Sequence, residues 1–573
     1  MKKLIFKFTF ILFPLLILNI TSFSQTGAKE TILNQLYEKE GERYFSFNSA
    51  NRETIRELSR IISIDKVDGS GKIFAYANKK EFSRFLDFCL SYELLPHPGH
   101  FEGFLNMKSR VDTRNIEEWD FYPTYDAYVD LMYQYAADYP SLCQVFSIGA
   151  TVQGRELLIA KISDNVGIKE NEPQFLYTST IHGDETTGYI LMLHLIDYLL
   201  SNYGADPKVN NLVDNIEIWI NPLANPDGTY HGGNNSVNNA YRYNANWVGL
   251  NRNYPDPEDG PHPDGEEWQP ETMLFMDVAS NNHFVSSANI HGGTEVCNYP
   301  WDTWQKLTAD DNWWQYVCHE YADTAQNYSP SWYMTGYDDG ITNGWQWYEV
   351  AGGRQDYMTY FQQGREFTLE ISDTKLMEPD SLPYYWLFNY HSLLNYMEQS
   401  TFGLRGTVKD SITGLPMKAE VFVIFHEKDS SWVYSSLPNG NYHRLLYEGN
   451  YTVRYSAPGY LSEVRSNVAI TNGQATILNV KLLPEGVGGI ENNEVSNDIQ
   501  VYPNPLHGQA MHVESTVRVD QIDIYDLSGN RIIQLKTENY SSEIHLPDLN
   551  DGLYFIRFFT DKGLGVKKIV VDH

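Results

Sequence analysis

The chain is poor in cysteine and in positive charge. Its 573 residues include four cysteines, and 42 Lys and Arg residues against 74 Asp and Glu residues give a formal net charge of −32. This acidic balance argues against nucleic acid as a partner and is typical of a soluble protein that faces water. No two of the cysteines have metal-ligand spacing, which excludes a cysteine metal cluster of Cys89, Cys143, Cys297 and Cys318. Outside the cytoplasm Cys297 and Cys318 could pair, but their spacing does not decide it.

The N-terminus lacks a run long enough to span a bilayer comfortably. Its apolar stretch Phe8–Leu18 is short and is interrupted by Pro14. Three lysines precede this stretch, and Ser22-Phe23-Ser24 after it offers a cleavage site between small residues. Residues 1–24 are therefore predicted to be an export signal, which leaves no stable transmembrane segment once removed; a retained anchor helix is the alternative. No cysteine follows the run, so a lipid-anchored N-terminus is not expected.

The length of the chain excludes a single hydrophobic core and favours about three to five domains. The predicted order is an export signal (1–24), a small α/β domain (25–115), an α/β domain whose mixed central sheet is flanked by helices (116–400), a β-sandwich (401–484), a polar linker (485–498) and a second β-sandwich (499–573).

Short strand-like and helical stretches define the first of these domains. Tyr44–Phe47 and Lys72–Tyr76 are predicted strands, and Glu53–Ile62 is a predicted helix. Lys80–Leu90 is a second predicted helix, with an apolar face made of Phe82, Phe85, Leu86 and Cys89.

The second domain alternates apolar strands with helical patterns. Leu157–Ile162, Gln174–Thr178 and Ile216–Ile220 are predicted strands, and Thr186–Leu200 has the periodicity of a helix that packs on a sheet. This alternation indicates an α/β domain with a largely buried mixed sheet. From residue 402 onward short strands and turns replace helices, with one predicted strand defined by alternating Ala419, Val421, Val423 and Phe425.

Two short motifs of the second domain suit a metal ion. His182 and Glu185 follow a predicted strand and open a predicted helix, where a spacing of three lets both side chains face the same way. His291 follows the strand-like run Val285–Ile290 and precedes two glycines. Two histidines and one glutamate leave the fourth position of a tetrahedral zinc ion for water, which is typical of catalytic zinc. For each residue alone, a surface or capping position is the alternative.

Two arginines and a glutamate accompany these motifs. Arg242 and Arg252 flank a loop rich in asparagine that includes Asn251, and such guanidinium and amide donors suit a carboxylate. A solvated basic loop is the alternative. Glu370 lies in the apolar strand-like run Phe367–Ile371, where burial of a carboxylate is costly without a task. A general base near a metal is therefore a fair hypothesis.

Taken together, these motifs make residues 120–400 resemble the zinc metallocarboxypeptidases, nearest to the regulatory branch that includes carboxypeptidases D, E, N and M. The resemblance implies one zinc ion and assigns its ligands to His182, Glu185 and His291. It further implies a substrate-carboxylate clamp at Asn251 and Arg252, a carbonyl-polarising arginine at Arg242, a mobile tyrosine at Tyr348 and a catalytic glutamate at Glu370. The implied reaction is hydrolysis of the last peptide bond of a peptide or protein, with Glu370 taking a proton from the zinc-bound water.

The resemblance also implies a preference for C-terminal Lys or Arg. Asp302, eleven residues after His291, and Gln355 match the positions that favour basic side chains in the regulatory branch. Asp302 has an alternative role as a helix cap before Thr303. Arg354 replaces an apolar residue that is usual in this stretch, and its charge could weaken the selection.

One position departs from the family pattern. Gly249 stands two residues before Asn251, where the family usually has an aspartate bonded to the first zinc histidine. Losing such a group typically costs roughly 10–100-fold in metal affinity or activity. Asn246 or a water molecule could replace it. A surface binding protein that has lost turnover is thus an alternative, and a cell-wall peptide carboxypeptidase is another, since the clamp suits any free α-carboxylate.

The other domains show resemblances of their own. The N-terminal α/β domain resembles the pro-segments of secreted metallocarboxypeptidases, with a permanent accessory domain as the alternative. Gly406-Thr407-Val408 and Ala457–Tyr460 resemble the transthyretin-like domain of the regulatory branch. Tyr502–Pro505, Gly552-Leu553-Tyr554 and the terminal Lys567-Lys568 pair resemble a type IX secretion sorting domain. This implies the type IX machinery as a partner and export through the periplasm of a gram-negative-type envelope to the cell surface or medium. An ordinary β-sandwich is the alternative for each C-terminal domain.

Overall fold

The computed structural model describes residues 25–572 except 40, 50, 69, 113–117, 486–493, 528 and 548. The predicted export signal and most of the predicted linker lie outside the described residues. Across those residues, no helix combines the length and apolarity needed to cross a membrane. The chain divides into two compact units: the first contains residues up to 407 with 420–453 and 465–479, and the second contains the remainder.

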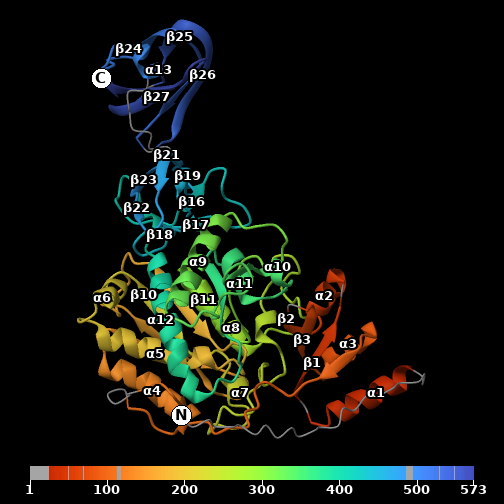
Figure 1. The fold of residues 1–573 in the computed structure, drawn as a ribbon. Coiled ribbons are helices and arrows are strands. Elements are labelled where there is room, and N and C mark those ends of the chain that lie inside the picture. The colour runs from red at the N-terminus through yellow and green to blue at the C-terminus, as the bar shows by residue number, and fades with distance from the viewer. Residues whose placement is uncertain are drawn as a thin grey trace. The chain divides into compact units, whose positions relative to one another are not determined.

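The N-terminal domain is a four-stranded antiparallel sheet with helices (Figure 1). Its strand order is β2-β3-β1-β4, so β2 is an edge strand. Its elements are α1 (Gln25–Leu36), β1 (Glu42–Asn48), α2 (Arg52–Ser59), β2 (Ser63–Val67), β3 (Lys72–Asn78), α3 (Lys79–Phe85), the 3₁₀ turn η1 (Leu86–Phe88) and β4 (Tyr92–Leu94).

The predicted strands and both predicted helices of this domain are present. Asn78 and Glu81 form a capping box that fixes the start of α3. The prediction for Cys89 was wrong: α3 ends at Phe85, and Cys89 lies beyond it, exposed and in the left-handed backbone region. A 3₁₀ turn interrupts the helical period before the cysteine reaches the apolar face.

The central domain is built on an eight-stranded mixed sheet of order β13-β12-β14-β11-β9-β10-β8-β7. Strands β10, β9, β11 and β14 run parallel at its centre. The strands are β7 (Cys143–Ala150), β8 (Glu156–Ile162), β9 (Gln174–Ser179), β10 (Glu217–Asn221), β11 (Phe284–His291), β12 (Thr294–Tyr299), β13 (Ile341–Asn343) and β14 (Arg365–Ser372), and β5 (Met107–Lys108) pairs with β6 (Tyr122–Pro123) apart from them.

Helices cover both faces of this sheet, which explains its apolar strands. In β8, Leu158 and Ala160 pack into one core and Leu157 and Ile159 into the other. The first core is closed by α4 (Tyr125–Asp138), α5 (Thr187–Asn202), α6 (Pro207–Val213), α9 (Asp311–Asn327) and α12 (Leu382–Gln399). The second is closed by α8 (Pro270–Asn281) and α11 (Arg354–Tyr360). Shorter helices are α7 (Pro226–Thr229), η3 (Leu250–Arg252), α10 (Gly344–Trp347) and η4 (Pro379–Ser381). The mixed sheet flanked by helices confirms the predicted fold of this domain.

Residues 403–484 are all β. Two sheets have the orders β18-β15-β23-β20, with β22 beside β15, and β17-β16-β19-β21. Their strands are β15 (Gly403–Asp410), β16 (Glu420–Val423), β17 (Val433–Tyr434), β18 (Asn441–Arg444), β19 (Gly449–Ser456), β20 (Tyr460–Leu461), β21 (Glu463–Ile470), β22 (Ala475–Ile477) and β23 (Val480–Pro484). Phe425 does not continue the buried alternation of β16: the strand ends at Val423, and Phe425 is fully exposed with a positive φ.

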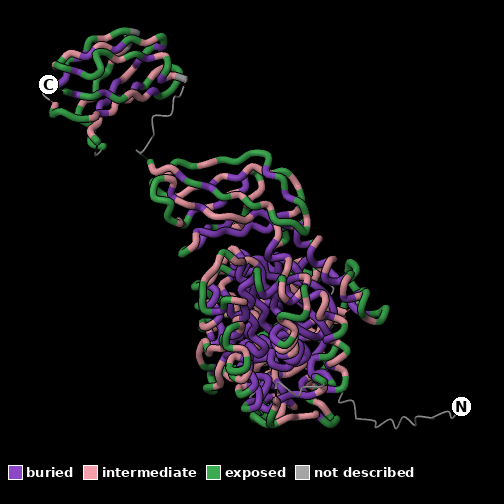
Figure 2. Tube along the Cα trace, turned by 90° about the vertical axis from the view of Figure 1, so that its left-hand side faces the viewer, coloured by how far each residue is buried: buried purple, intermediate pink, exposed green. Residues whose placement is uncertain are grey.

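The C-terminal part is also all β. Strands pair in the order β24-β25-β27-β28, with β26 beside β25. The elements are α13 (Glu494–Asn497), β24 (Ile499–Tyr502), β25 (Ala510–Tyr525), β26 (Arg531–His545), β27 (Gly552–Thr560) and β28 (Gly563–Val571). Buried and less buried residues alternate along these strands, as Figure 2 shows, whereas the central strands β9, β10, β11 and β14 are buried along nearly their whole length.

Candidate metal and substrate-binding site

The predicted metal ligands meet at the carboxyl ends of the parallel strands. His182 and Glu185 lie in the turn between β9 and α5, and His291 is the last residue of β11. Helix α5 begins at Thr187, so the prediction that His182 and Glu185 open the helix was slightly wrong. In β14, Glu370 stands directly opposite His291 in the sheet register. Parallel strands thus bring residues nearly 190 positions apart into one site.

The three ligands present their donor atoms to one point. Nδ1 of His182 lies 3.0 Å from Nδ1 of His291, and the carboxylate oxygens of Glu185 lie 2.9 Å from each of these nitrogens. All three side chains are buried. Burial lowers the pKa of His182 and of His291 below the ordinary value, which keeps both rings neutral. Two neutral imidazoles and a carboxylate are the donor set that catalytic zinc takes, so the residues fit the ion.

The second nitrogen of each histidine differs in its surroundings. Nε2 of His291 lies 2.8 Å from the side-chain amide of Asn289, which can hold the ring in place. Among the described residues, no carboxylate is bonded to Nε2 of His182. Gly249 supplies none, and the amide of Asn246 is bonded to Gln269 instead. The suggestion that Asn246 replaces the missing aspartate was therefore wrong.

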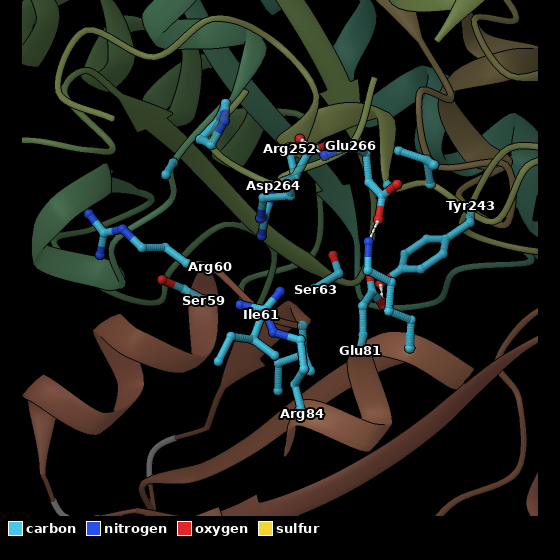
Figure 3. Close-up of a pocket in the computed structure, with 16 residues that line it drawn as sticks. Ser59, Arg60, Ile61, Ser63, Glu81, Arg84, Tyr243, Arg252, Asp264 and Glu266 are labelled. Carbon is cyan, nitrogen blue, oxygen red and sulfur yellow. Dashed lines mark hydrogen bonds and ion pairs between the residues drawn. The ribbon is translucent and has the colours of Figure 1, made fainter. Parts of the chain in front are cut away.

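Gly249 borders a cavity between the N-terminal and central domains (Figure 3). In Figure 3, Ser59, Arg60 and Arg84 of the N-terminal domain face Arg252 and Asp264 across this cavity. A Cβ at position 249 would meet only the ring of Tyr243, at 3.4 Å. The backbone at position 249 can therefore carry a Cβ without a clash, so steric crowding at the Cβ does not account for the absence of a carboxylate here.

A second cavity joins the metal ligands to the predicted clamp. Its lining includes His182, His291, Arg242, Asn251, Arg252, Asp302, Tyr348 and Glu370. The structure thus brings together all the site residues predicted from the sequence except Glu185 and Gln355, which lie just behind its wall, bonded to His182 and Asp302.

The clamp arginine carries a buried charge without a carboxylate. Arg252 is 8% exposed and donates to two backbone carbonyls, Asn251 O at 2.8 Å and Ile64 O at 3.2 Å. Its Nε has no hydrogen-bond partner. Burial lowers the pKa of Arg252, as expected for a cation in need of an anion. The backbone N–H of Arg354 binds Oδ1 of Asn251, which leaves the Asn251 amide group as a donor.

The other arginine is fully paired. Nη1 of Arg242 lies 3.0 Å from Glu185 and 3.4 Å from Asp65, and its Nε donates to Ser63 Oγ at 3.0 Å. Its backbone N–H donates to Glu42 at 2.6 Å. Asp65, Ser63 and Glu42 belong to the N-terminal domain, so three residues of that domain contact Arg242.

The predicted base and tyrosine also lie in the cavity. Glu370 is buried, its Oε2 has no hydrogen-bond partner, and burial together with the charge of Glu185 raises its pKa well above the ordinary value. A carboxylate in such a setting takes up a proton more readily. The hydroxyl of Tyr348 donates to the backbone carbonyls of Ile64 at 3.4 Å and Asp65 at 3.3 Å.

Asp302 and its hydrogen-bond partners form another part of the cavity wall. One oxygen of this buried carboxylate accepts from Asn298 Nδ2 and from Gln355 Nε2, both at 3.0 Å. Burial raises the pKa of Asp302 to about 7, although the Asn298 bond opposes this. No helix follows Thr303 until α9, so the helix-cap alternative was wrong.

Arg354 is paired inside the protein. Its guanidinium is buried against Glu366, at 3.2 Å, and against Thr178. Weaker selection of basic side chains because of Arg354 stays a prediction, which this pairing disfavours.

Sequence reasoning missed Asp65 and Lys375. The Lys375 ammonium is buried and contacts Glu185 at 2.7 Å, Asp65, and the carbonyl of Gly292. Burial acts to lower the pKa of Lys375, but Asp65 and Glu185 raise it above the ordinary value. Asp65 is buried in β2, between Ile64 and Lys66. The criterion that identified Glu370, a carboxylate within an apolar strand, does not select Asp65, because Ser63 and Lys66 make this strand mixed in polarity.

The four cysteines are free thiols. Cys143, Cys297 and Cys318 are buried, and burial together with its neighbour Cys318 raises the pKa of Cys297 well above the ordinary value. Cys297 and Cys318 are neighbours in the structure, but they are free thiols and do not form a disulfide.

Three family models match the chain. A zinc carboxypeptidase model matches residues 128–392, a carboxypeptidase regulatory-like domain matches residues 403–483, and a secretion system C-terminal sorting domain matches residues 500–572. All three fall in the regions where the sequence showed the corresponding resemblance.

Curated proteins with similar sequences support the same grouping. The human carboxypeptidase N catalytic chain is 33% identical over 450 residues, which cover 70% of this chain and 93% of that one. Mouse carboxypeptidase M is 34% identical over 351 residues, covering 57% and 75%. Mouse carboxypeptidase D is 35% identical over 366 residues, covering 61% and 26%, so the chain spans about a quarter of the carboxypeptidase D proteins that it matches.

Proposed function

Because the chain belongs to the zinc carboxypeptidase family, we propose that it removes the last residue from peptides or proteins with one zinc ion. The observation that carries this proposal is the buried Arg252 cation, which forms no ion pair among the described residues and lines the same cavity as His182 and His291. An unpaired buried charge is costly, and the terminal carboxylate of a peptide would neutralise it through two parallel hydrogen bonds. Asn251 and Tyr348 are placed to donate to the same group.

The remaining residues suit the hydrolytic step. Zinc bound by His182, Glu185 and His291 would polarise the scissile carbonyl and acidify a water molecule. Glu370, with its free oxygen in the cavity, would accept the proton of this water and pass it to the leaving amine. The guanidinium of Arg242 would donate to the oxygen on which negative charge develops.

Activity and metal content test this assignment together. The zinc-loaded protein should release C-terminal Arg from a short peptide. Glu370→Gln should retain about one zinc per chain while turnover falls by roughly 10²–10⁴-fold, the usual contribution of a general base. Full activity in this variant would sink the assignment.

We further propose that the enzyme prefers C-terminal Lys or Arg. Asp302 supplies the anion, and its bonds from Asn298 and Gln355 hold it at the cavity wall. Arg354, whose charge could weaken this selection, is buried and paired with Glu366. Faster cleavage of a peptide ending in Phe than of one ending in Arg would defeat this preference.

The N-terminal domain is proposed to keep the enzyme latent, in the manner of a pro-segment. Its edge strand β2 gives the carbonyl of Ile64 to Arg252 and Tyr348 and the carboxylate of Asp65 to Arg242 and Lys375. These contacts lie where the proposed substrate would bind, so both cannot be present at once.

Limited proteolysis tests this latency. Trypsin should cut the connection between the domains at the exposed Arg110 or at Arg114 and raise activity at least tenfold. A matched Arg110→Gln/Arg114→Gln protein should stay inactive under the same treatment. Equal activity before and after cleavage would contradict latency and would favour a permanent accessory domain.

The C-terminal domain is proposed to direct export. Its match to a secretion system sorting domain supports recognition by the type IX machinery after passage into the periplasm. A chain truncated after residue 498 should then accumulate in the periplasm, whereas the full chain should reach the surface or medium. Release of the truncated chain to the medium would argue against this role.

Two alternatives to the proposed peptide carboxypeptidase activity make different predictions. Because Gly249 leaves His182 without a bonded carboxylate, a binding protein with lost turnover is one; it predicts zinc content without Arg release. A cell-wall peptide carboxypeptidase is the other, and it predicts release of D-amino acids from cell-wall peptides rather than Arg from ordinary ones.

A further inference from the structure

The N-terminal strand shows where groups of an extended chain lie in this site. Ser63 Oγ accepts from Arg242 and Ile64 O accepts from the clamp residue Arg252, while the Tyr348 hydroxyl lies 3.4 Å from Ile64 O and 3.3 Å from Asp65 O. One residue on, Asp65 reaches Lys375, and next Lys66 lies 3.4 Å from the carbonyl of Gly293. Strand β2 therefore passes from the clamp toward Gly293 in the course of three residues.

A substrate must run through the site in the opposite direction. Its carboxylate would lie at the clamp, and its chain would lead away toward the N-terminus, whereas β2 leaves the clamp toward its C-terminus. This reversal explains how β2 can occupy the site without presenting a terminal carboxylate. Neighbouring residues of an extended chain are about 3.3 Å apart in either direction. The residue one step from the clamp, occupied here by Asp65, thus corresponds to the penultimate residue of a substrate.

Lys375 faces that position with a donor that the central domain does not satisfy. An ammonium group has three hydrogen-bond donors. Two are used within the central domain, by Gly292 O and Glu185, and the third is used by Asp65. Once the N-terminal domain has left, Asp65 no longer accepts this third donor, and among the described residues of the central domain Lys375 shares its ion-pair partner Glu185 with Arg242. One carboxylate then faces two cations, so a second anion beside Lys375 would be favourable.

The geometry points to Lys375 as a specificity residue that selects an acidic side chain at the penultimate position of the substrate. The inference rests on the proposed function, because it takes the terminal residue to lie at Arg252. The favoured substrates are peptides that end in Asp or Glu followed by Lys or Arg. The side chain of Asp65 occupies this subsite in the latent protein.

Matched peptides test the inference on folded full-length protein that has been nicked by trypsin and freed of its N-terminal fragment. Three peptides that differ only in a penultimate Glu, Gln or Lys before a terminal Arg should be cleaved with kcat/KM falling in that order, with about tenfold between Glu and Gln. Lys375→Met should reduce the Glu-to-Gln ratio to below about twofold, and Lys375→Arg should restore most of it. Lys306→Met, which changes an exposed lysine paired with Asp429, is the matched control and should leave the ratio unchanged.

Binding to the Glu370→Gln protein provides a measurement that does not depend on turnover. The Glu peptide should bind about tenfold more tightly than the Gln peptide, and the added Lys375→Met change should equalise them at unchanged zinc content. Equal binding of Glu and Gln peptides, or a preference that survives Lys375→Met, would overturn the inference. If no peptide is cleaved but the binding preference for Glu persists, the proposed carboxypeptidase function would be contradicted, whereas the inference about Lys375 would stand.

Discussion

Arg242 and Arg252 lie ten residues apart in one loop and line one cavity, yet their partners differ. Arg242 faces two carboxylates, Glu185 and Asp65, and these raise its pKa above the ordinary value even though burial acts to lower it. Arg252 donates to two backbone carbonyls and forms no ion pair among the described residues, and burial lowers its pKa although the charge of Asp302 opposes this. The N-terminal domain thus supplies an anion next to the metal ligands and none at the clamp. Asp65 is the anion that this domain places beside Arg242 and Lys375, while Arg252 is left without an ion pair among the described residues.

The comparison is tested most strongly in the activated enzyme. Arg242→Ala should lower kcat by roughly 10²–10³-fold with little change in KM, because this side chain is proposed to act on charge that develops during the reaction. Arg252→Ala should instead act mainly on KM, since it would remove binding that the substrate makes throughout. Steady-state kinetics on the Arg peptide measures both. The same kinetic effect from both variants would erase the distinction.

In the latent protein, the contact of Asp65 with Arg242 should matter more than the contacts of Arg252. Asp65→Asn leaves Arg242 and Lys375 without their anion, and breaking such a buried pair costs about 3–5 kcal/mol. We expect the activity of the uncut protein to rise by at least about tenfold. Asp259→Asn, which breaks a partly exposed pair with Arg60, is the control and should change it less than about twofold. If the two variants behave alike, Asp65 does not hold the domain in place.

The carboxyl group of Asp302 at the cavity wall should make the preference for a C-terminal Arg depend on pH. Burial raises the pKa of Asp302 to about 7, so this carboxyl group is largely neutral at pH 6 and largely charged at pH 8. The ratio of kcat/KM for a peptide ending in Arg to one ending in Gln should therefore increase several-fold between these values. Asp302→Asn should abolish the change. A ratio that is flat with pH in the unmodified enzyme would show that Asp302 does not set the preference.

The smallest effect is expected at the rim of the domain interface. Lys80 and Glu266 form an ion pair there, with the lysine side chain 62% exposed. Pairs of this kind contribute about 0.2–1 kcal/mol and are screened by salt. Lys80→Met should change the latent activity less than about fivefold, and only at low ionic strength. A large effect at high salt would mean that the rim, not Asp65, dominates the interface.

Local motifs were enough to predict residues that the structure brings together, while their surroundings required the fold. His182, Glu185, His291 and Glu370 were predicted from short motifs and from the order of these motifs along the chain, and the structure places them at one cavity. The contacts of Asp65 with Lys375 and Arg242 join residues far apart in sequence, and no local pattern shows which edge strand enters the cavity. The orientation of Arg354 depends likewise on Glu366, a partner visible only once α11 packs on β14.

Strand patterns predicted the sheets better than they predicted where elements end. Apolar runs gave β8, β9 and β11 because both faces of the central sheet are buried. Element ends depend instead on single residues and their hydrogen bonds. A 3₁₀ turn displaced Cys89, and β16 stopped before Phe425.

The core of the N-terminal domain continues into its neighbour, since Tyr348 and Val350 pack with Phe45, Phe47 and Phe85. After release, the freed domain would carry an open apolar face and lose part of its own stability. We expect it to unfold or be degraded sooner than it rebinds. Activation would then be a one-way event, with the timing of the first cut, and not a binding equilibrium, setting how much enzyme is working.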